Sequence, residues 1–315
     1  MRRRTMKDDK SGVSQVRSSS KKKLSSDPFV YEMNEPWSAD VAIVAEQAYL
    51  AFTDVLSNQQ QIIHDKLNNA PAPSNIGNNR VDLSDYPKEF QDWVEEYVLN
   101  NRTLNKMIED WEMLFNEWLL GTIMLVGEIN YLNIPVEIPF SPEGVFGKYD
   151  FIDNKLMDWI EWRARFSATE IVGTSADRVR KLIYDTISDG PYSIDKVQSV
   201  LQRDYAFSDD RARSIARTEI LTSQTTGQFS SDMKFADEGL LLGKVWQASN
   251  DERVRHSHQE AHNQFKEFYE PFIVNGELLM YPRDSEMGAG ANNVIQCRCT
   301  YQLLWKDLDE DKMKQ

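Results

Sequence analysis

The sequence predicts an α+β fold, with a mainly helical N-terminal region followed by a C-terminal module of a long helix packed on a small antiparallel sheet. Apolar residues recur at three- and four-residue spacing between about 37 and 188, which is typical of amphipathic helices. A further helical segment at 208–238 is followed by segments of alternating polarity after residue 240, which indicate strands. A length of 315 residues with 41% hydrophobic residues is enough for two domains.

Residues 1–27 are expected to form a disordered basic arm. They hold nine Lys or Arg residues against three Asp residues, a net charge of +6, and almost no large apolar side chain. The whole chain has a formal charge of −14, so the remainder carries −20 and should repel nucleic acid over most of its surface. A protein that coats duplex DNA is therefore excluded. The arm is either a solvated tail or a segment that contacts phosphate or an acidic partner.

The region 28–190 is predicted to be a helical domain. Helical spacing covers about 37–67, 86–127 and 150–188, and segments rich in Pro, Gly and Asn separate these blocks. Gly190-Pro191 is a strong helix breaker, and we place a domain boundary there.

No contact with a membrane is expected. The longest apolar run, WLLGTIMLVG at 118–127, is about half of the roughly 20 residues that cross a bilayer. The basic N-terminus has no apolar stretch behind it and does not read as a signal peptide. Two cysteines cannot form a disulfide framework, so a reducing compartment is expected.

The long helix should begin after Ser208, a good N-cap that is followed by two aspartates, and should stop at Gly239. Strands are expected at 240–249 and 294–305, with a hairpin at 272–281 that turns at Asn275-Gly276. Alternation in the last strand should place these side chains on one face: Ile295, Cys297, Cys299, Tyr301, Leu303 and Trp305. Residues 306–315 are a charged tail.

Five of the six His and Cys residues lie between 256 and 299. If Asp251 caps a helix that begins at Glu252, His258 and His262 stand one turn apart on one face, whereas His256 points elsewhere. Together with Cys297 and Cys299 they offer a Cys2His2 set of the kind that zinc binds.

The regular geometry of a strand argues against this zinc site. Residues two apart on a strand have Cα atoms about 6.6 Å apart, whereas thiolates that share a zinc ion must come closer. The strand would need a bulge at Arg298. Three interpretations therefore stay open for Cys297 and Cys299: packing in a core, a structural zinc site, and catalysis by a Cys nucleophile or a His base.

The charged residues near this group suggest a structural network. Arg217 or Arg253 could pair with Glu219 or Asp251 and fix the long helix against the sheet. The sequence contains no phosphate loop, dinucleotide fingerprint, nucleophile elbow or H-E-x-x-H zincin motif, so the common enzyme classes gain no support.

Six strings occur in a recognisable order: IARTEI at 215–220, KVWQAS at 244–249, DERVRHSHQEAHN at 251–263, EPF at 270–272, YPRD at 281–284 and IQCRC at 295–299. With this order the segment from about 195 to 305 resembles the phage head morphogenesis family, the minor head proteins of the phage Mu F type, so we expect a domain of this type at 191–305. The family motifs correspond to Arg217, Thr218, Glu219, Trp246, Asp251, Arg253, His258, Cys297, Arg298 and Cys299. The sequence departs from the family at Asn263, where Gly is common, and at Gln296, where Asn is common.

This resemblance implies a minor capsid protein of the virion, assembled in the host cytoplasm, that assists procapsid assembly. Its expected partners are the portal protein and capsid or scaffold proteins, with a weak DNA contact through residues 1–27. No enzymatic activity comes with the family, and zinc is the only cofactor suggested. The alternative is a zinc- or Cys-dependent hydrolase or toxin-like module delivered with phage DNA.

Overall fold

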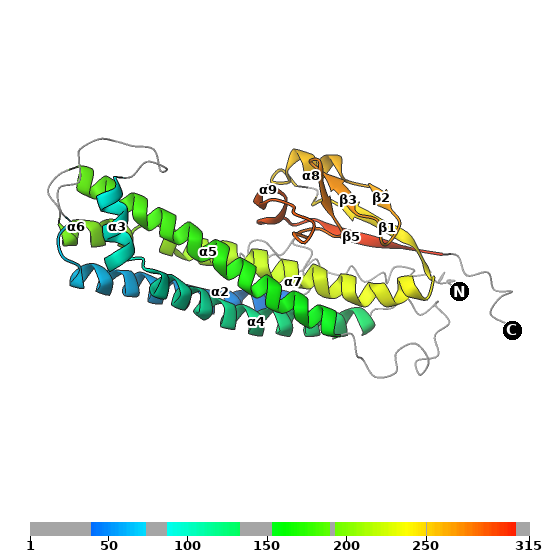
Figure 1. Cartoon of the computed structure of the whole chain (residues 1–315). Coiled ribbons are helices and arrows are strands. Elements are labelled where there is room, and N and C mark those ends of the chain that lie inside the picture. The colour runs from blue at the N-terminus through cyan, green and yellow to red at the C-terminus, as the bar shows by residue number, and fades with distance from the viewer. Residues whose placement is uncertain (1–38, 74–86, 133–152, 190–192, 250, 307–315) are drawn as a thin grey trace, which may run out of the picture. The chain divides into compact units, whose positions relative to one another are not determined.

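The computed structural model describes residues 39–73, 87–132, 153–189, 193–249 and 251–306. Long helices are followed by a module of short strands (Figure 1), which confirms the predicted α+β class. The predicted basic arm at 1–27 and the charged tail beyond residue 306 lie outside the described residues.

The helical part contains six α-helices and one 3-10 helix within the described ranges: α2 (Ala39–Asn69), α3 (Lys88–Tyr97), α4 (Asn101–Leu132), α5 (Asn154–Ser188), α6 (Ile194–Gln202), η1 (Tyr205–Phe207) and α7 (Asp209–Asp237). Side chains cap several of the helices: Asp153, Ser193 and Ser208, for example, each accept a hydrogen bond from a backbone N–H in the first turn. The predicted N-cap at Ser208 is thereby confirmed.

Helix α7 ends where the sequence predicted. Gly239 has φ of 73°, and its N–H donates to the Ala236 carbonyl while Leu240 N–H donates to the Phe235 carbonyl. A glycine in the left-handed conformation just after a helix satisfies the last carbonyls at no steric cost.

Helix α7 packs against α2 and α4, and α4 packs against α5. Gly227 of α7 permits a close approach, since a Cβ there would lie 3.2 Å from the Ile123 Cα of α4. Helices from both sides of the predicted boundary therefore pack together, while Gly190 and Pro191 themselves lie outside the described residues. None of the described helices is long and apolar enough to span a bilayer.

The strands form two small antiparallel sheets. Strand β1 (Leu241–Gln247) lies between β2 (Phe265–Lys266) and β5 (Thr300–Trp305), and β3 (Phe272–Val274) pairs with β4 (Glu277–Leu279). Asn275 and Gly276 have φ of 52° and 78°, which confirms the predicted two-residue hairpin turn.

The long helix packs on the sheet through aromatic side chains. Phe229 of α7 stacks on Phe268 with ring centroids 4.8 Å apart, and its ring also meets Tyr281 and Tyr301. Such ring pairs add about 0.5–1.5 kcal/mol each beyond the burial of their area. The predicted packing of helix on sheet is therefore observed.

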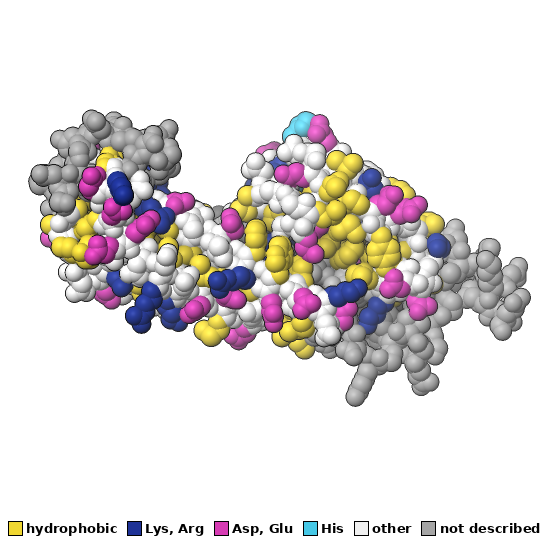
Figure 2. Space-filling model, viewed as in Figure 1, with side chains coloured by type: hydrophobic (Ala, Val, Ile, Leu, Met, Phe, Trp, Pro, Cys, Tyr) yellow, Lys and Arg dark blue, Asp and Glu magenta, His cyan; other side chains and the backbone are white. Residues whose placement is uncertain are grey.

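Hydrophobic side chains gather on the outer face of the C-terminal module (Figure 2). The exposed apolar residues of its strands are Leu242, Phe265, Ile273 and Leu278, and Ile273 lies directly across the hairpin from Leu278. An apolar surface of this kind is typical of a site that contacts another protein.

Two elements differ from the sequence prediction. The expected strand at 294–305 is wrong in its first half, because helix α9 (Ala291–Val294) and a loop precede β5, and Ile295 is exposed. The expected helix from Glu252 is also wrong, since α8 spans only His256–Glu260. The cause in the first case is Gln296, whose φ of 53° interrupts an extended chain.

Candidate metal centre

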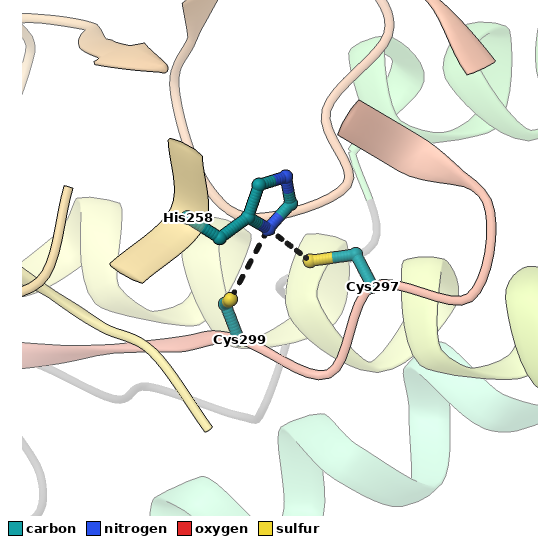
Figure 3. A group of neighbouring side chains, drawn as sticks. All are labelled: His258, Cys297 and Cys299. Atoms are coloured by element: carbon teal, nitrogen blue, oxygen red, sulfur yellow. Dashed lines mark hydrogen bonds between the residues drawn. The ribbon is translucent and has the colours of Figure 1, made fainter. Parts of the chain in front are cut away.

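His258, Cys297 and Cys299 converge in the interior of the C-terminal module (Figure 3). The His258 Nδ1 atom lies 3.3 Å from the Cys299 Sγ and 3.5 Å from the Cys297 Sγ. Helix α8 supplies the histidine and the loop before β5 supplies both cysteines. The three ligand atoms all lie within 4.8 Å of one another, and no other His, Cys, Asp or Glu of the described part of the chain joins them.

The conformation of the cysteine loop removes the geometric objection that a regular strand raised. Gln296 adopts a left-handed conformation and the Cys297 N–H donates to the Val294 carbonyl, so the chain turns before it enters β5. Both thiols then reach the same imidazole nitrogen. Gln296 and Asn263, where the sequence departs from the family, both have positive φ, a conformation that Gly and Asn tolerate best.

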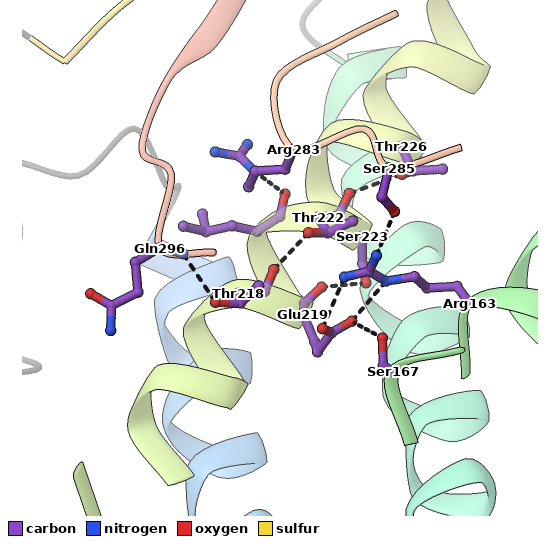
Figure 4. A network of polar contacts seen from close by, with 11 residues as sticks. Arg163, Ser167, Thr218, Glu219, Thr222, Ser223, Thr226, Arg283, Ser285 and Gln296 are labelled. Carbon is purple, nitrogen blue, oxygen red and sulfur yellow. Dashed lines mark hydrogen bonds and ion pairs between the residues drawn. The ribbon is translucent and has the colours of Figure 1, made fainter. Parts of the chain in front are cut away.

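Helix α7 and Arg283 hold this loop in place (Figure 4). The Gln296 N–H donates to the Thr218 hydroxyl, 3.2 Å away. Arg283 is buried and donates to the carbonyls of Cys297 and Cys299 at 2.8 and 2.9 Å, while its Nε donates to the Leu221 carbonyl of α7. Thr218 of the Arg-Thr-Glu motif and Arg283 of the Tyr-Pro-Arg-Asp string therefore position the cysteines.

The hydrogen bonds of Asn293 fix the tautomer of His258. The Asn293 side-chain amide nitrogen donates to the Val274 carbonyl and to the Glu277 carboxylate, so its oxygen must face the imidazole. That oxygen lies 3.1 Å from the His258 Nε2, which must then carry the proton. The unprotonated Nδ1 consequently directs its lone pair at the two thiols.

The electrostatic environment favours a thiolate. Burial by itself would raise the pKa of Cys297, yet the hydrogen bond from the Cys299 thiol and the charge of Arg283 hold it well below its usual range. The hydrogen bond to Cys297, together with burial, raises the pKa of Cys299. One proton is therefore readily lost from the pair.

The group lies in the interior of the module beside aromatic side chains. His258, Cys297 and Cys299 are each only 1% exposed. The Trp246 ring meets the His258 ring edge to face at 5.8 Å and packs in the same way against Phe272. Trp246, which corresponds to the tryptophan of the family motif, therefore lines one side of the site.

The structure does not bring every predicted ligand together. His262 lies outside the short helix α8 and its Nδ1 accepts a hydrogen bond from the Ala248 N–H, so the predicted Cys2His2 set is reduced to three residues. His256 is exposed and faces Glu260, as expected of a histidine outside the site.

The remaining motif residues surround the cysteine loop. Arg298 donates two hydrogen bonds to Asp251, whose pKa falls to about 2 mainly because of this contact. Arg253 lies 4.0 Å from the same carboxylate, so Arg253 and Asp251 do pair, but both lie outside α7 and their contact does not fix that helix against the sheet. Burial, followed by the charges of Arg298 and Arg253, lowers the pKa of Arg217 to about 10.

The predicted partner of Glu219 was wrong. Glu219 is buried and pairs with Arg163 of α5, and it also accepts a hydrogen bond from Ser167 (Figure 4). Arg163 further donates to Ser285 of the C-terminal module. No motif or periodicity in the sequence singled out Arg163 or Asn293, whereas Arg283 lies within one of the motif strings.

Comparison with known proteins confirms the resemblance. Residues 177–302 match the family model described as phage Mu protein F like protein. The chain is also 24% identical over 196 residues to the uncharacterized protein YqbB of Bacillus subtilis (strain 168), which covers 61% of this chain and 59% of that protein. The match to YqbB is longer than the whole stretch from residue 177 to residue 315, so it must include residues of the helical region before residue 177. No solved structure matches the chain.

Proposed function

We propose that this protein is a minor component of a phage head that associates with the portal and assists procapsid assembly. The observation that carries the proposal is the match of residues 177–302 to the phage Mu protein F like family. The buried ion pair between Arg163 of α5 and Glu219 of α7 joins the helical region to the matched segment, which supports one structural unit that includes both.

The helical region offers a candidate surface for the portal. Trp162 and Phe166 of α5 are both exposed, and their rings stack 5.3 Å apart. Met113 of the neighbouring helix α4 is also exposed, and the ion pair between Glu112 and Arg165 joins the two helices at this level. Aromatic and Met side chains are enriched in protein interfaces, so this surface suits a protein partner.

Co-expression with the portal protein of the same phage tests this proposal. The full-length chain should co-purify with the portal, and the double variant Trp162→Ser, Phe166→Ser should co-purify at least tenfold less. Tyr205→Ser is the matched control, since Tyr205 is an exposed aromatic residue that belongs to η1 and not to α5. A wild-type chain that does not associate with the portal would count against the whole proposal, and equal binding by all three proteins would exclude this surface.

The basic arm supports a weak contact with packaged DNA. Residues 1–27 carry +6 on a chain whose other residues carry −20, so they are the segment that phosphate attracts. DNA binding by the full-length chain should weaken steeply with salt and should disappear when the nine Lys and Arg residues of the arm are replaced by Gln. Unchanged binding by that variant would contradict the contact.

The geometry supports a structural C-terminal module over the alternative hydrolase or toxin-like module. A nucleophilic cysteine must be reached by its substrate, whereas Cys297 and Cys299 are 1% exposed behind Trp246. The zinc binding expected from the sequence is therefore proposed here in a structural role and not in catalysis. Capsid or scaffold proteins are the further proposed partners, and co-purification from assembling procapsids tests them.

A further inference from the structure

We infer that His258, Cys297 and Cys299 bind one Zn²⁺ ion, which fastens helix α8 to the cysteine loop and so shapes the C-terminal module. The inference rests on the site geometry; it specifies the structural zinc role included in the proposed function and does not depend on the association with the portal.

The spacing of the ligand atoms suits three corners of a tetrahedral zinc site, with the fourth corner left to water or another small donor. Zinc lies about 2.3 Å from thiolate sulfur and about 2.0–2.1 Å from imidazole nitrogen, which puts sulfur and nitrogen about 3.6 Å apart across a tetrahedral angle. The observed separations between the His258 Nδ1 and the two sulfurs are 3.3 and 3.5 Å. A zinc ion can therefore enter with shifts of a few tenths of an ångström.

The imidazole is already prepared for a metal. Asn293 accepts the Nε2 proton and leaves the Nδ1 lone pair directed at the site. Metal-bound histidines commonly donate their other N–H to an oxygen in this way, which fixes the ring and raises its basicity. Asn293 is itself held by Val274 and Glu277, so the support extends into β3 and β4.

The donor set selects the kind of metal. Two thiolates and one imidazole favour zinc or another soft or borderline cation, whereas Ca²⁺ and Mg²⁺ require oxygen ligands. Arg283 donates to both cysteine carbonyls and so holds a positive charge beside the two sulfur ligands, as suits the deprotonated form that zinc binds.

The ion would close a long loop. His258 and Cys299 are 41 positions apart in the sequence, and the residues between them include the β3–β4 hairpin. Arg298, between the two ligating cysteines, pairs with Asp251 at the surface. A bound zinc ion would therefore fix the position of Arg298 as well as the path of the loop that holds the two cysteines.

Metal analysis of the full-length chain tests this inference. The reduced chain, loaded with Zn²⁺ and freed of excess metal, should retain stoichiometric zinc, and Co²⁺ should give the absorption bands of a thiolate-bound tetrahedral ion. The double variant Cys297→Ser, Cys299→Ser should lose both signals. His256→Gln should retain them, because His256 is an exposed histidine of the same helix that faces away from the site.

A second variant guards against loss of folding. Asn293→Ala keeps all three ligands and removes the group that orients His258, together with its hydrogen bonds to Val274 and Glu277, so its zinc affinity should fall about 10–100-fold. The inference is overturned if the folded wild-type chain binds neither Zn²⁺ nor Co²⁺ under reducing conditions. It is also overturned if the cysteine variant binds as much metal as the wild type.

Discussion

Arg163 and Glu219 form a two-point ion pair in the interior of the protein, with Nε–Oε2 and Nη2–Oε1 distances of 3.0 and 2.9 Å. The two residues come from α5 and α7, and both side chains are less than a tenth exposed. The Glu of the Arg-Thr-Glu motif thus contacts the helical region, while Thr218 beside it contacts the cysteine loop. This motif joins the two parts of the fold.

Replacement of Arg163 by Met should destabilise the protein by about 3–5 kcal/mol, because it leaves the Glu219 carboxylate buried without its partner. Arg165→Met is the matched control, since Arg165 makes an exposed ion pair with Glu112 that should contribute less than about 1 kcal/mol. Urea unfolding of the wild type and the two variants measures both changes in the free energy of unfolding. Equal effects of the two substitutions would contradict the structural role of the buried pair.

Substitution of Gly243 by Ala should disrupt the pairing of β1 with β2. A Cβ at this position would lie 2.2 Å from the Lys266 carbonyl oxygen and 2.7 Å from the Phe265 ring. We expect a loss of about 1–3 kcal/mol in the free energy of unfolding. Gly173→Ala in α5 meets no neighbour within 4 Å and should instead stabilise its helix by up to about 1 kcal/mol. If both substitutions destabilised the protein, the close contacts at Gly243 would not explain the loss of stability there.

The stability of the protein should depend on pH through Asp232. Burial, opposed by hydrogen bonds from Tyr301 and Gln228, raises the pKa of this carboxyl from 3.8 to about 7. The folded state therefore holds a proton that the unfolded state loses. The stabilising contribution is fully present below about pH 4 and disappears as the pH rises to about 7.

Asp232→Asn isolates this contribution, because Asn still accepts the hydrogen bond from the Tyr301 hydroxyl and does not titrate. Urea unfolding at pH 4.5 and 7.5 should show a smaller loss of stability with rising pH in the variant than in the wild type. Parallel pH profiles for the two proteins would be inconsistent with a raised pKa at Asp232.

Removal of zinc should lower the stability of the C-terminal module. A ligand present at about 100 times its dissociation constant contributes about 2.7 kcal/mol to the folded state. A chelator should therefore lower the unfolding midpoint of the zinc-loaded wild type and leave that of Cys297→Ser, Cys299→Ser unchanged. A chelator effect of equal size on both proteins would point to metal bound elsewhere.

The helices were predictable because their signals are local. Ser208 and Gly239 mark the two ends of α7 through hydrogen bonds to residues within four positions. The hairpin turn is likewise local, because it depends on the positive φ angles of Asn275 and Gly276. The family motifs also identified Cys297 and Cys299 as residues of interest.

The site itself could be predicted only in part. The meeting of both thiols at His258 depends on the left-handed conformation of Gln296, a residue that rarely adopts it, so spacing alone suggested a strand. Arg163 lies 56 positions from Glu219, and only the packing of α5 against the motif helix reveals that pair. Contacts of this kind follow from the tertiary fold and leave no periodic signal.

X-ray absorption at the zinc edge of the loaded full-length chain reports the ligands of the metal itself. We expect two sulfur atoms at about 2.3 Å and a nitrogen of one imidazole at about 2.0–2.1 Å from the zinc ion. A zinc shell of oxygen and nitrogen atoms without sulfur would contradict this expectation.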